Sequence, residues 1–486
     1  MHKISGILLH VLLILSFSTT ALADQGLWND LNARFYDLIA EGKYSEATKT
    51  GEEALKIAKD EFGANHPNAA ISLKNLGDLY FSKGDYNRSE SLYKRVLKIH
   101  KKAFGKNHSA VAADLNNLAF IYFSQGNYDE AETLYREAQA IDEKLYGKKH
   151  PNIAIYLNNL AGLFKDQNKY SEAEKYFKQA LIIQQGALEP HHPDVILTLN
   201  NLAGLYQEEG GYDKAETLFK DLLKTQEKKL GSDHPDLALT LSNLADLYFI
   251  QENHIKAESL YKQALLINEK TYGKDHPNVA ANLNDLAELF TARKKYAQAE
   301  SLYTRALIIY ENALGPNHPE VALSLNNLGD LYLFQGDYGR SESFCKRALA
   351  IDEDVLGKNH PDVAAQLGNL AEICRNLNRP AEAESLYKRA LAIDEKTLGK
   401  DHPEVAADLN NLAELYFLQN KYPKAERLFK RALTIYENTF GPDHPDIAVV
   451  LENMAALYRK LGKKEAAEEL RKRSEKIRLN TETSDT

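Results

Sequence analysis

The 486-residue sequence predicts an all-α protein, a right-handed α-solenoid (an α–α superhelix) of about eleven helix hairpins. The first observation is a histidine that recurs every 42 residues from His66 to His444 without a slip. The second is a leucine column with the same period. The third is an apolar spacing of three and four residues inside each unit, which is typical of helices. A fixed period of this length indicates one helical unit that buries its apolar face against its neighbours.

Histidine, glycine, proline and leucine mark the repeat. Glycine stands three residues before nine of the ten histidines, Glu189 replaces it once, and proline follows every histidine except His108. The histidine column consists of His66, His108, His150, His192, His234, His276, His318, His360, His402 and His444. The leucine column consists of Leu73, Leu115, Leu157, Leu199, Leu241, Leu283, Leu325, Leu367, Leu409 and Leu451.

The first helix of each unit follows the histidine. In residues 403–441, taken as the type, one apolar helical face consists of Leu409, Leu412, Ala413 and Tyr416. Polar residues before such a face cap the helix, so we expect His444 or Asp443 to cap the first helix of the next unit. Pro445 then lies near the start of that helix, where its missing N–H costs nothing.

The second helix follows a short turn at Asn420 and Lys421, where other units have glycine, as at Gly84. Its expected buried positions are Tyr422, Ala425, Phe429, Ala432 and Leu433. We expect the small residues at 413, 425 and 432 to let the two helices approach closely. Gly441 should end the second helix as a left-handed cap.

The two ends of the chain depart from the repeat. Residues 1–23 predict a signal peptide, because an apolar stretch from Ile7 to Phe17 follows Lys3 and precedes the small-x-small pattern that ends at Ala23. The protein is therefore expected to be exported, periplasmic or secreted, with no transmembrane segment. Residues 24–66 predict a degenerate N-terminal capping hairpin, 67–444 nine regular repeats, 445–478 a C-terminal capping hairpin, and 479–486 a disordered tail.

The composition excludes several classes of protein. There are 60 Lys and Arg residues against 69 Asp and Glu residues, and the net charge is -9. Nucleic acid is therefore not expected as a partner, since its binding needs clustered Lys and Arg to displace counterions. With only two cysteines, the chain cannot be a disulfide scaffold or a multi-cysteine zinc module.

The pattern Leu-Ala-x-x-Tyr followed by Tyr-x-x-Ala-x-x-x-Phe-x-x-Ala resembles the tetratricopeptide repeat (TPR). The 42-residue period, with Leu-Asn-Asn-Leu-Ala in the first helix and Leu-Gly-x-x-His-Pro between units, is similar to the repeats of kinesin light chains and their bacterial relatives. The resemblance covers about residues 27–478 and implies a solenoid that binds peptides or proteins. We do not expect a motor-linker role, because a signal peptide precedes the array instead of a heptad-repeat segment.

Neither the histidine column nor the glutamate column predicts a metal site or a catalytic site. Successive histidines lie a whole repeat apart, too far to share a metal ion, and are interpreted as loop and cap residues. The glutamate column at 90, 132, 174, 216, 258, 300, 342, 384, 426 and 468 has Lys or Arg four residues later in all but one unit, where Thr304 stands, and is interpreted as surface ion pairs. No catalytic motif was found. We therefore expect a protein that is not an enzyme, with no cofactor and no metal.

The candidate binding surface is the face of the first helix opposite the buried leucines. Family resemblance implies that this face lines a concave groove. One asparagine column on it suits the backbone of an extended peptide, since an amide both donates and accepts hydrogen bonds; the alternative is that these amides bond one another. The column consists of Asn75, Asn117, Asn159, Asn201, Asn243, Asp285, Asn327, Asn369, Asn411 and Asn453.

The residue three positions later sets the polarity of this groove. In the N-terminal half it is neutral, with Phe120, Gly162 and Gly204. In the C-terminal half it is acidic, with Asp246, Glu288, Asp330, Glu372 and Glu414. The predicted partner is therefore a protein or extended peptide that is basic or neutral where it meets the C-terminal half.

Two further sites depend on the compartment. Cys345 and Cys374 replace aromatic residues of neighbouring units and are expected near one seam, where they either form a disulfide or remain two buried thiols. Asn87 and Asn107 begin glycosylation sequons, which matter only if the host glycosylates exported proteins.

The sequence favours a non-catalytic scaffold or adaptor that works outside the cytoplasm by holding a peptide or protein in its concave groove. The first alternative is a structural protein whose arrays self-associate. The second is a regulatory subunit of an exported enzyme complex. The sequence leaves the oligomeric state open.

Overall fold

The computed structural model describes residues 26–40, 42–167, 169–189 and 192–484. Within these ranges the chain forms 22 helices and no strand. Consecutive helices pack as eleven antiparallel hairpins, so the all-helical solenoid is confirmed. The predicted signal peptide, residues 1–23, lies outside the described residues.

Each hairpin contains one odd-numbered and one even-numbered helix. The odd-numbered helices are α1 (Gly26–Ala40), α3 (Pro67–Ser82), α5 (Ser109–Ser124), α7 (Pro151–Asp166), α9 (Pro193–Glu208), α11 (Pro235–Ile250), α13 (Pro277–Ala292), α15 (Pro319–Phe334), α17 (Pro361–Asn376), α19 (Pro403–Leu418) and α21 (Pro445–Lys460). The even-numbered helices are α2 (Tyr44–Phe62), α4 (Tyr86–Phe104), α6 (Tyr128–Tyr146), α8 (Tyr170–Ala187), α10 (Tyr212–Leu230), α12 (His254–Tyr272), α14 (Tyr296–Leu314), α16 (Tyr338–Val355), α18 (Pro380–Thr397), α20 (Tyr422–Phe440) and α22 (Lys464–Ser484).

The last helix is longer than the sequence pattern predicts. It continues to Ser484, so most of the segment assigned to a disordered tail is helical in the structure. None of the 22 described helices has a stretch apolar and long enough to cross a bilayer.

Histidine starts ten of the odd-numbered helices, as the sequence predicts for His444. In each case the imidazole Nδ1 accepts a hydrogen bond from the backbone N–H two residues later, at 3.0–3.3 Å. A nitrogen that accepts must be unprotonated, so every cap uses the neutral form of the ring. The histidine column is therefore a set of helix caps, which accounts for its strict period.

Small residues hold the two helices of a hairpin together. Ala413, Ala425 and Ala432 are fully buried, as predicted from their close approach. Gly441 ends α20 with φ of 85°, but its ψ is 170°, so it is extended rather than in the left-handed helical conformation that we predicted. Only glycine populates that region readily, which explains the glycine column.

Neighbouring hairpins share a buried polar pair at one position. The side chain of the even-numbered helix meets the residue fourteen positions later in the next odd-numbered helix. The pairs differ from unit to unit: His100 meets Asp114 at 2.7 Å, and the Thr240 hydroxyl donates to Gln226 at 2.9 Å. Most pairs combine a donor with an acceptor, as buried polar groups require.

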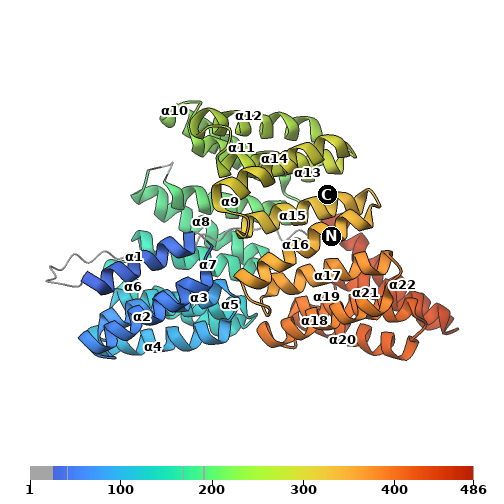
Figure 1. Cartoon of the computed structure of the whole chain (residues 1–486), viewed down its shortest axis with the longest axis horizontal. Coiled ribbons are helices and arrows are strands. Elements are labelled where there is room, and N and C mark those ends of the chain that lie inside the picture. The colour runs from blue at the N-terminus through green and yellow to red at the C-terminus, as the bar shows by residue number, and fades with distance from the viewer. Residues whose placement is uncertain (1–25, 41, 168, 190–191, 485–486) are drawn as a thin grey trace.

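The array is curved, with the odd-numbered helices on the inside. Successive odd-numbered helices contact one another, as α5 does α7 and α11 does α13, whereas no successive even-numbered helices in the described chain come as close. The helices on the inside of a bend are the ones that crowd together, so the odd-numbered helices form the concave side. In Figure 1 the chain passes from the blue N-terminal helices over the green middle to the orange C-terminal helices, and the blue and orange parts meet again.

Candidate functional site

The candidate site is the side of the odd-numbered helices that faces away from the buried leucines, here called the inner face. In α11 it is formed by Leu239, Asn243, Asp246 and Ile250, which are spaced by four, three and four residues and so share one helical face. Leu239 and Ile250 are 55% and 53% exposed, and Asp246 is exposed as well. The inner face of α11 is therefore accessible along the length of the helix.

The asparagine column lies on this face, but its members differ in exposure. Asn369 is exposed, eight members are half-buried, and Asn75 is buried at 3%. Asn75 bonds to α1, donating to the Asn32 side chain at 2.9 Å and accepting from the Tyr36 hydroxyl at 2.9 Å. The terminal hairpin thus covers the first member of the column.

Two other members use their amides to join repeats. The Asn159 amide donates to Asn116 at 2.7 Å, and the Asn453 amide donates to Asn410 at 3.0 Å. Each bond links the second asparagine of one unit to the first asparagine of the preceding unit. In these places the alternative interpretation, amides that bond one another, describes the contact.

The acidic column also lies on the inner face, and its C-terminal end is partly neutralised. Arg375 reaches Glu414 at 2.9 Å and Glu372 at 3.6 Å. Asp78, which stands at the same position in α3 outside the acidic column, pairs with Lys74 at 3.1 Å. The predicted negative charge is thus weakest near α17 and α19.

The other three carboxylates of the column lie before this end. Asp246, in α11, accepts a hydrogen bond from the Tyr261 hydroxyl, and Glu288 and Asp330 follow on α13 and α15. A tyrosyl donor orients a carboxylate without cancelling its charge. The acidic part of the inner face is therefore centred on α11, α13 and α15.

The N-terminal half of the inner face is neutral and partly aromatic. The Phe120 ring lies 5.1 Å from the ring centre of Phe81 in the preceding unit and 6.2 Å from that of Phe123. A β-carbon on Gly162 or Gly204 would meet no other atom within 4 Å, so these positions face open space. The inner face thus has an apolar area around Phe120, followed by open space above Gly162 and Gly204.

Sequence reasoning missed an apolar column on the same face. It stands four residues before each member of the asparagine column. The signal that could have revealed it is a large apolar side chain on the helix face opposite the buried leucines. Among its members, Ile71, Leu239, Leu323 and Val449 are 43–55% exposed. The full column is Ile71, Ala113, Ile155, Leu197, Leu239, Ala281, Leu323, Ala365, Ala407 and Val449.

The glutamate column forms the predicted surface pairs and, in addition, links repeats. Glu384, for example, pairs with Lys388 at 2.6 Å and accepts from the hydroxyl of Tyr416 in the next unit at 3.0 Å. The Lys388 ammonium, the Tyr416 hydroxyl and Lys421 lower the pKa of Glu384 to about 2. This glutamate is a structural residue of the seam between hairpins.

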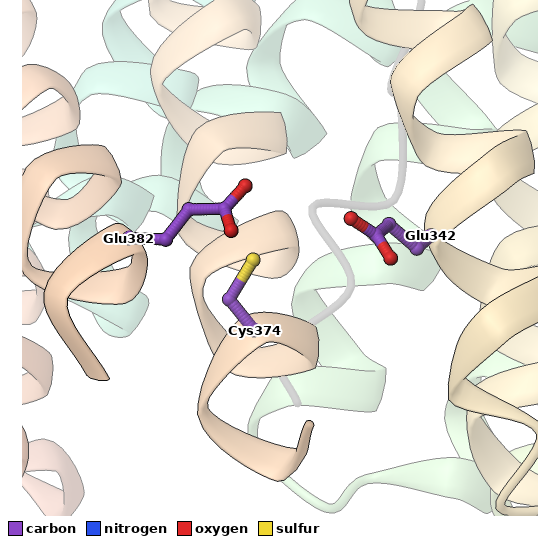
Figure 2. Close-up of side chains that lie close together, drawn as sticks. All are labelled: Glu342, Cys374 and Glu382. Atoms are coloured by element: carbon purple, nitrogen blue, oxygen red, sulfur yellow. The ribbon is translucent and has the colours of Figure 1, made fainter. Parts of the chain in front are cut away.

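One unit modifies this seam and brings together a cysteine and two carboxylates. Glu342, Cys374 and Glu382 place one ligand atom each within 4.8 Å of the others, a spacing that a metal ion could bridge (Figure 2). Cys374 stands where six other units have a tyrosine that donates to the glutamate, so Glu342 lacks that donor. Arg379 replaces it with two bonds of 2.8 Å to the Glu342 carboxylate.

The charges in this cluster do not fit a metal site. The Arg379 guanidinium and Lys346 ammonium lower the pKa of Glu342 to about 2, and both cations would have to be displaced by an ion. Burial raises the pKa of the Cys374 thiol to about 11, whereas a metal needs the thiolate. We conclude that the cluster is a variant of the glutamate seam.

The two cysteines are buried, free thiols in the structure. Cys345 packs with Leu370 and Ile373, while Cys374 belongs to the cluster around Tyr387. Their pairing under oxidising conditions stays a prediction. Asn87 and Asn107, the two sequon residues, are exposed.

Comparison with protein-family models gives one family, described as tetratricopeptide repeat. Its model matches the chain nine times, and the overlapping matches together cover most of it. The matched residues are 36–102, 109–186, 164–228, 194–265, 236–307, 281–354, 335–396, 362–438 and 409–480. A search of curated proteins returned no match.

Several solved structures resemble parts of the chain. BtubC (BKLC) from P. vanneervenii is 28% identical, with a TM-score of 0.39, covering 48% of this chain and 91% of its own. A protein from Podosopora anserina, described as a kinesin light chain with nearly identical TPR-like repeats, is 25% identical, with a TM-score of 0.35, covering 42% and 97%. A Rap protein complexed with competence and sporulation factor is 17% identical, with a TM-score of 0.42, covering 77% and 99%.

Proposed function

Because this chain belongs to the tetratricopeptide repeat family, we propose that it is a scaffold or adaptor that holds a protein segment against its inner face. Repeats of this family mediate protein–protein interaction and are generally non-catalytic. The single observation that carries the proposal is the composition of the inner face. It combines exposed apolar side chains, half-buried amides and a central acidic stretch on successive odd-numbered helices.

These three columns define the chemistry of the partner. Apolar contacts such as Leu239 and Leu323 supply affinity, amides satisfy an extended backbone, and the carboxylates of α11, α13 and α15 favour Lys or Arg. The proposed partner segment is extended, with apolar and basic side chains where it meets the central repeats, and neutral where it meets α5 to α9. No nucleic acid is expected, since the net charge of the chain is -9.

We further propose that binding takes place outside the cytoplasm, in the periplasm or after secretion. This proposal is supported by the pattern of residues 1–23, in which Lys3 precedes the apolar stretch and a small-x-small pattern that ends at Ala23 follows it. A fusion of residues 1–23 to a reporter that is active only after export tests it, and a reporter that stays inside the host would contradict it.

The acidic stretch can be tested by charge removal. In the variant Asp246→Asn, Glu288→Gln and Asp330→Asn, a basic partner captured by the full chain should bind more weakly, and its affinity should depend less on salt. The control replaces three exposed carboxylates of the even-numbered helices, Glu172→Gln, Asp213→Asn and Asp221→Asn, which also removes three charges. Equal effects of the two variants, or unchanged salt dependence in the first, would show that the inner face does not select the partner by charge.

A further inference from the structure

The first and second turns of the superhelix touch each other at three places. The short loops between the two helices of hairpins one, two and three lie against the loops that precede α15, α17 and α19. A β-carbon on Gly42 would lie 3.2 Å from Cδ2 of His318, and a β-carbon on Gly126 would lie 2.9 Å from Cδ2 of His402. The separation in sequence is 276 residues in each case (318 − 42, 360 − 84 and 402 − 126), about 6.6 units of 42 residues.

The closest of the three contacts is at Gly84. A β-carbon there would lie 2.6 Å from Cδ of Pro361 and 2.8 Å from Cδ2 of His360. The His360 ring also hydrogen-bonds to the backbone of Ser82, the last residue of α3. Only 11% of the His360 side chain is exposed, against 41% for His192, which caps α9 away from this contact.

The residues that follow these glycines extend the contact. Tyr44, at the start of α2, packs against the central hydrophobic cluster and lies near Glu320 in α15. Tyr86, at the start of α4, likewise lies near Asp362 in α17. Burial, together with the charges of Asp362 and Asp394, raises the pKa of Tyr86 to about 12. The first and second turns of the superhelix therefore meet along a line of repeated contacts.

At positions 42, 84 and 126 the contact restricts the side chain more than the backbone does. The same position has φ between 57° and 60° in other hairpins, yet it is occupied there by Glu252, Lys294, Asn378 and Asn420. A left-handed backbone is thus tolerated with a side chain in this turn. At Gly84 and Gly126 a side chain would collide with the opposite loop, and at Gly42 it would be tightly packed against it.

We propose that these three contacts form a latch that closes the superhelix on itself, so that the inner face is reached along the superhelix axis and its partner must be an extended chain rather than a folded domain. The part that concerns the partner rests on the proposed function, whereas the latch rests on the contacts alone. A helical array that touches itself after one turn leaves no lateral opening between the touching turns. Opening the latch separates the turns and gives lateral access.

The latch is tested by adding a side chain to the contacting turns. The variant Gly84→Asn with Gly126→Asn places asparagine, which Asn378 and Asn420 show to be compatible with this turn, against the opposite loops. The control is Gly336→Asn with Gly462→Asn, because a β-carbon at either position meets nothing within 4 Å. Circular dichroism should first show that the two variants have equal helix content.

Small-angle X-ray scattering of the full chains then reports their shape. We expect a larger radius of gyration and a longer maximum dimension for the latch variant, and wild-type values for the control. If the latch variant keeps the wild-type dimensions, or if both variants expand alike, the latch is wrong.

Access is measured separately with a linear peptide in which Lys alternates with Leu, used free or placed between two folded domains. The free peptide should bind the wild type and both variants, whereas the peptide held between domains should bind only the latch variant. Binding of the held peptide to the wild type would overturn the threading requirement. Failure of the free peptide to bind any form would contradict the proposed function, while the scattering result on the latch would stand.

Discussion

One buried pair between α18 and α19 should make the stability of the array fall as the pH rises. The polar position shared by neighbouring hairpins holds two carboxyl groups here, Asp394 and Asp408, which are 6% and 8% exposed and hydrogen-bonded to each other. Burial raises the pKa of both carboxyl groups, and the neighbouring Glu404 raises both further. Asp394 also raises the pKa of Asp408, whereas the hydrogen bond with Asp408 lowers that of Asp394. Two ionised carboxylates cannot share this site, so the folded pair keeps at least one proton at neutral pH.

The sign follows from the comparison with the unfolded chain, in which both aspartates ionise near pH 4. The folded state binds a proton that the unfolded state releases, so the contribution of the pair to stability is lost progressively as the pH rises above about 4. Each retained proton corresponds to about 1.4 kcal/mol per pH unit in the free energy of unfolding. Between pH 6 and pH 8 the loss is about 3 kcal/mol.

The substitution Asp408→Asn isolates this effect. The new amide can donate to the Asp394 carboxylate and needs no proton from solution. Urea unfolding followed by circular dichroism at pH 6, 7 and 8 should show the variant gaining about 3 kcal/mol on the wild type over this range. All other titrating groups are common to both proteins and cancel in the difference. Parallel pH profiles for the two proteins would refute the shared proton.

Two further predictions concern single side chains. Burial raises the pKa of the Cys345 thiol to about 12 and that of the Cys374 thiol to about 11. A thiol reagent at pH 8 should therefore react slowly with the native protein and label two thiols after denaturation. Fewer than two labelled thiols would indicate the disulfide. Leu409→Ala, at a fully buried position, should cost about 2–5 kcal/mol of unfolding free energy, whereas Leu418→Ala, 55% exposed on the inner face, should cost less than about 0.5 kcal/mol in the same urea titration. Similar losses for the two leucines would place the core elsewhere.

The fold was predictable because its determinants are local and repeated. The cap at His444, the turn at Asn420 and the buried Ala413, Ala425 and Ala432 each depend on a few neighbouring residues. When ten copies carry the same signals, the period and the hairpin follow directly from the sequence.

The arrangement of the inner face was only partly predictable. Helical spacing places Asn243 and Asp246 on one face, but it does not say which amides bond across repeats, as Asn159 does with Asn116. Nor does it show that Arg375 would lie between Glu372 and Glu414, since that contact joins two units. These details depend on the distance between neighbouring hairpins.

The latch could not be derived from the repeat at all. The contact of Gly84 with Pro361 joins residues more than six units apart, and its existence depends on the small rotation between successive hairpins summed over a full turn. Glycine at 42, 84 and 126 does not reveal the contact either, because Gly336 and Gly462 occupy the same position in hairpins that lack it.

The most direct test of the central claim is site-specific photo-crosslinking of a bound partner. A photoreactive phenylalanine analogue is placed at Leu239, on the inner face of α11, or at Leu266, on α12, which are 55% and 65% exposed. A partner held by the inner face should be crosslinked from position 239 and not from position 266. Crosslinking of the same partner from position 266 alone would contradict the account.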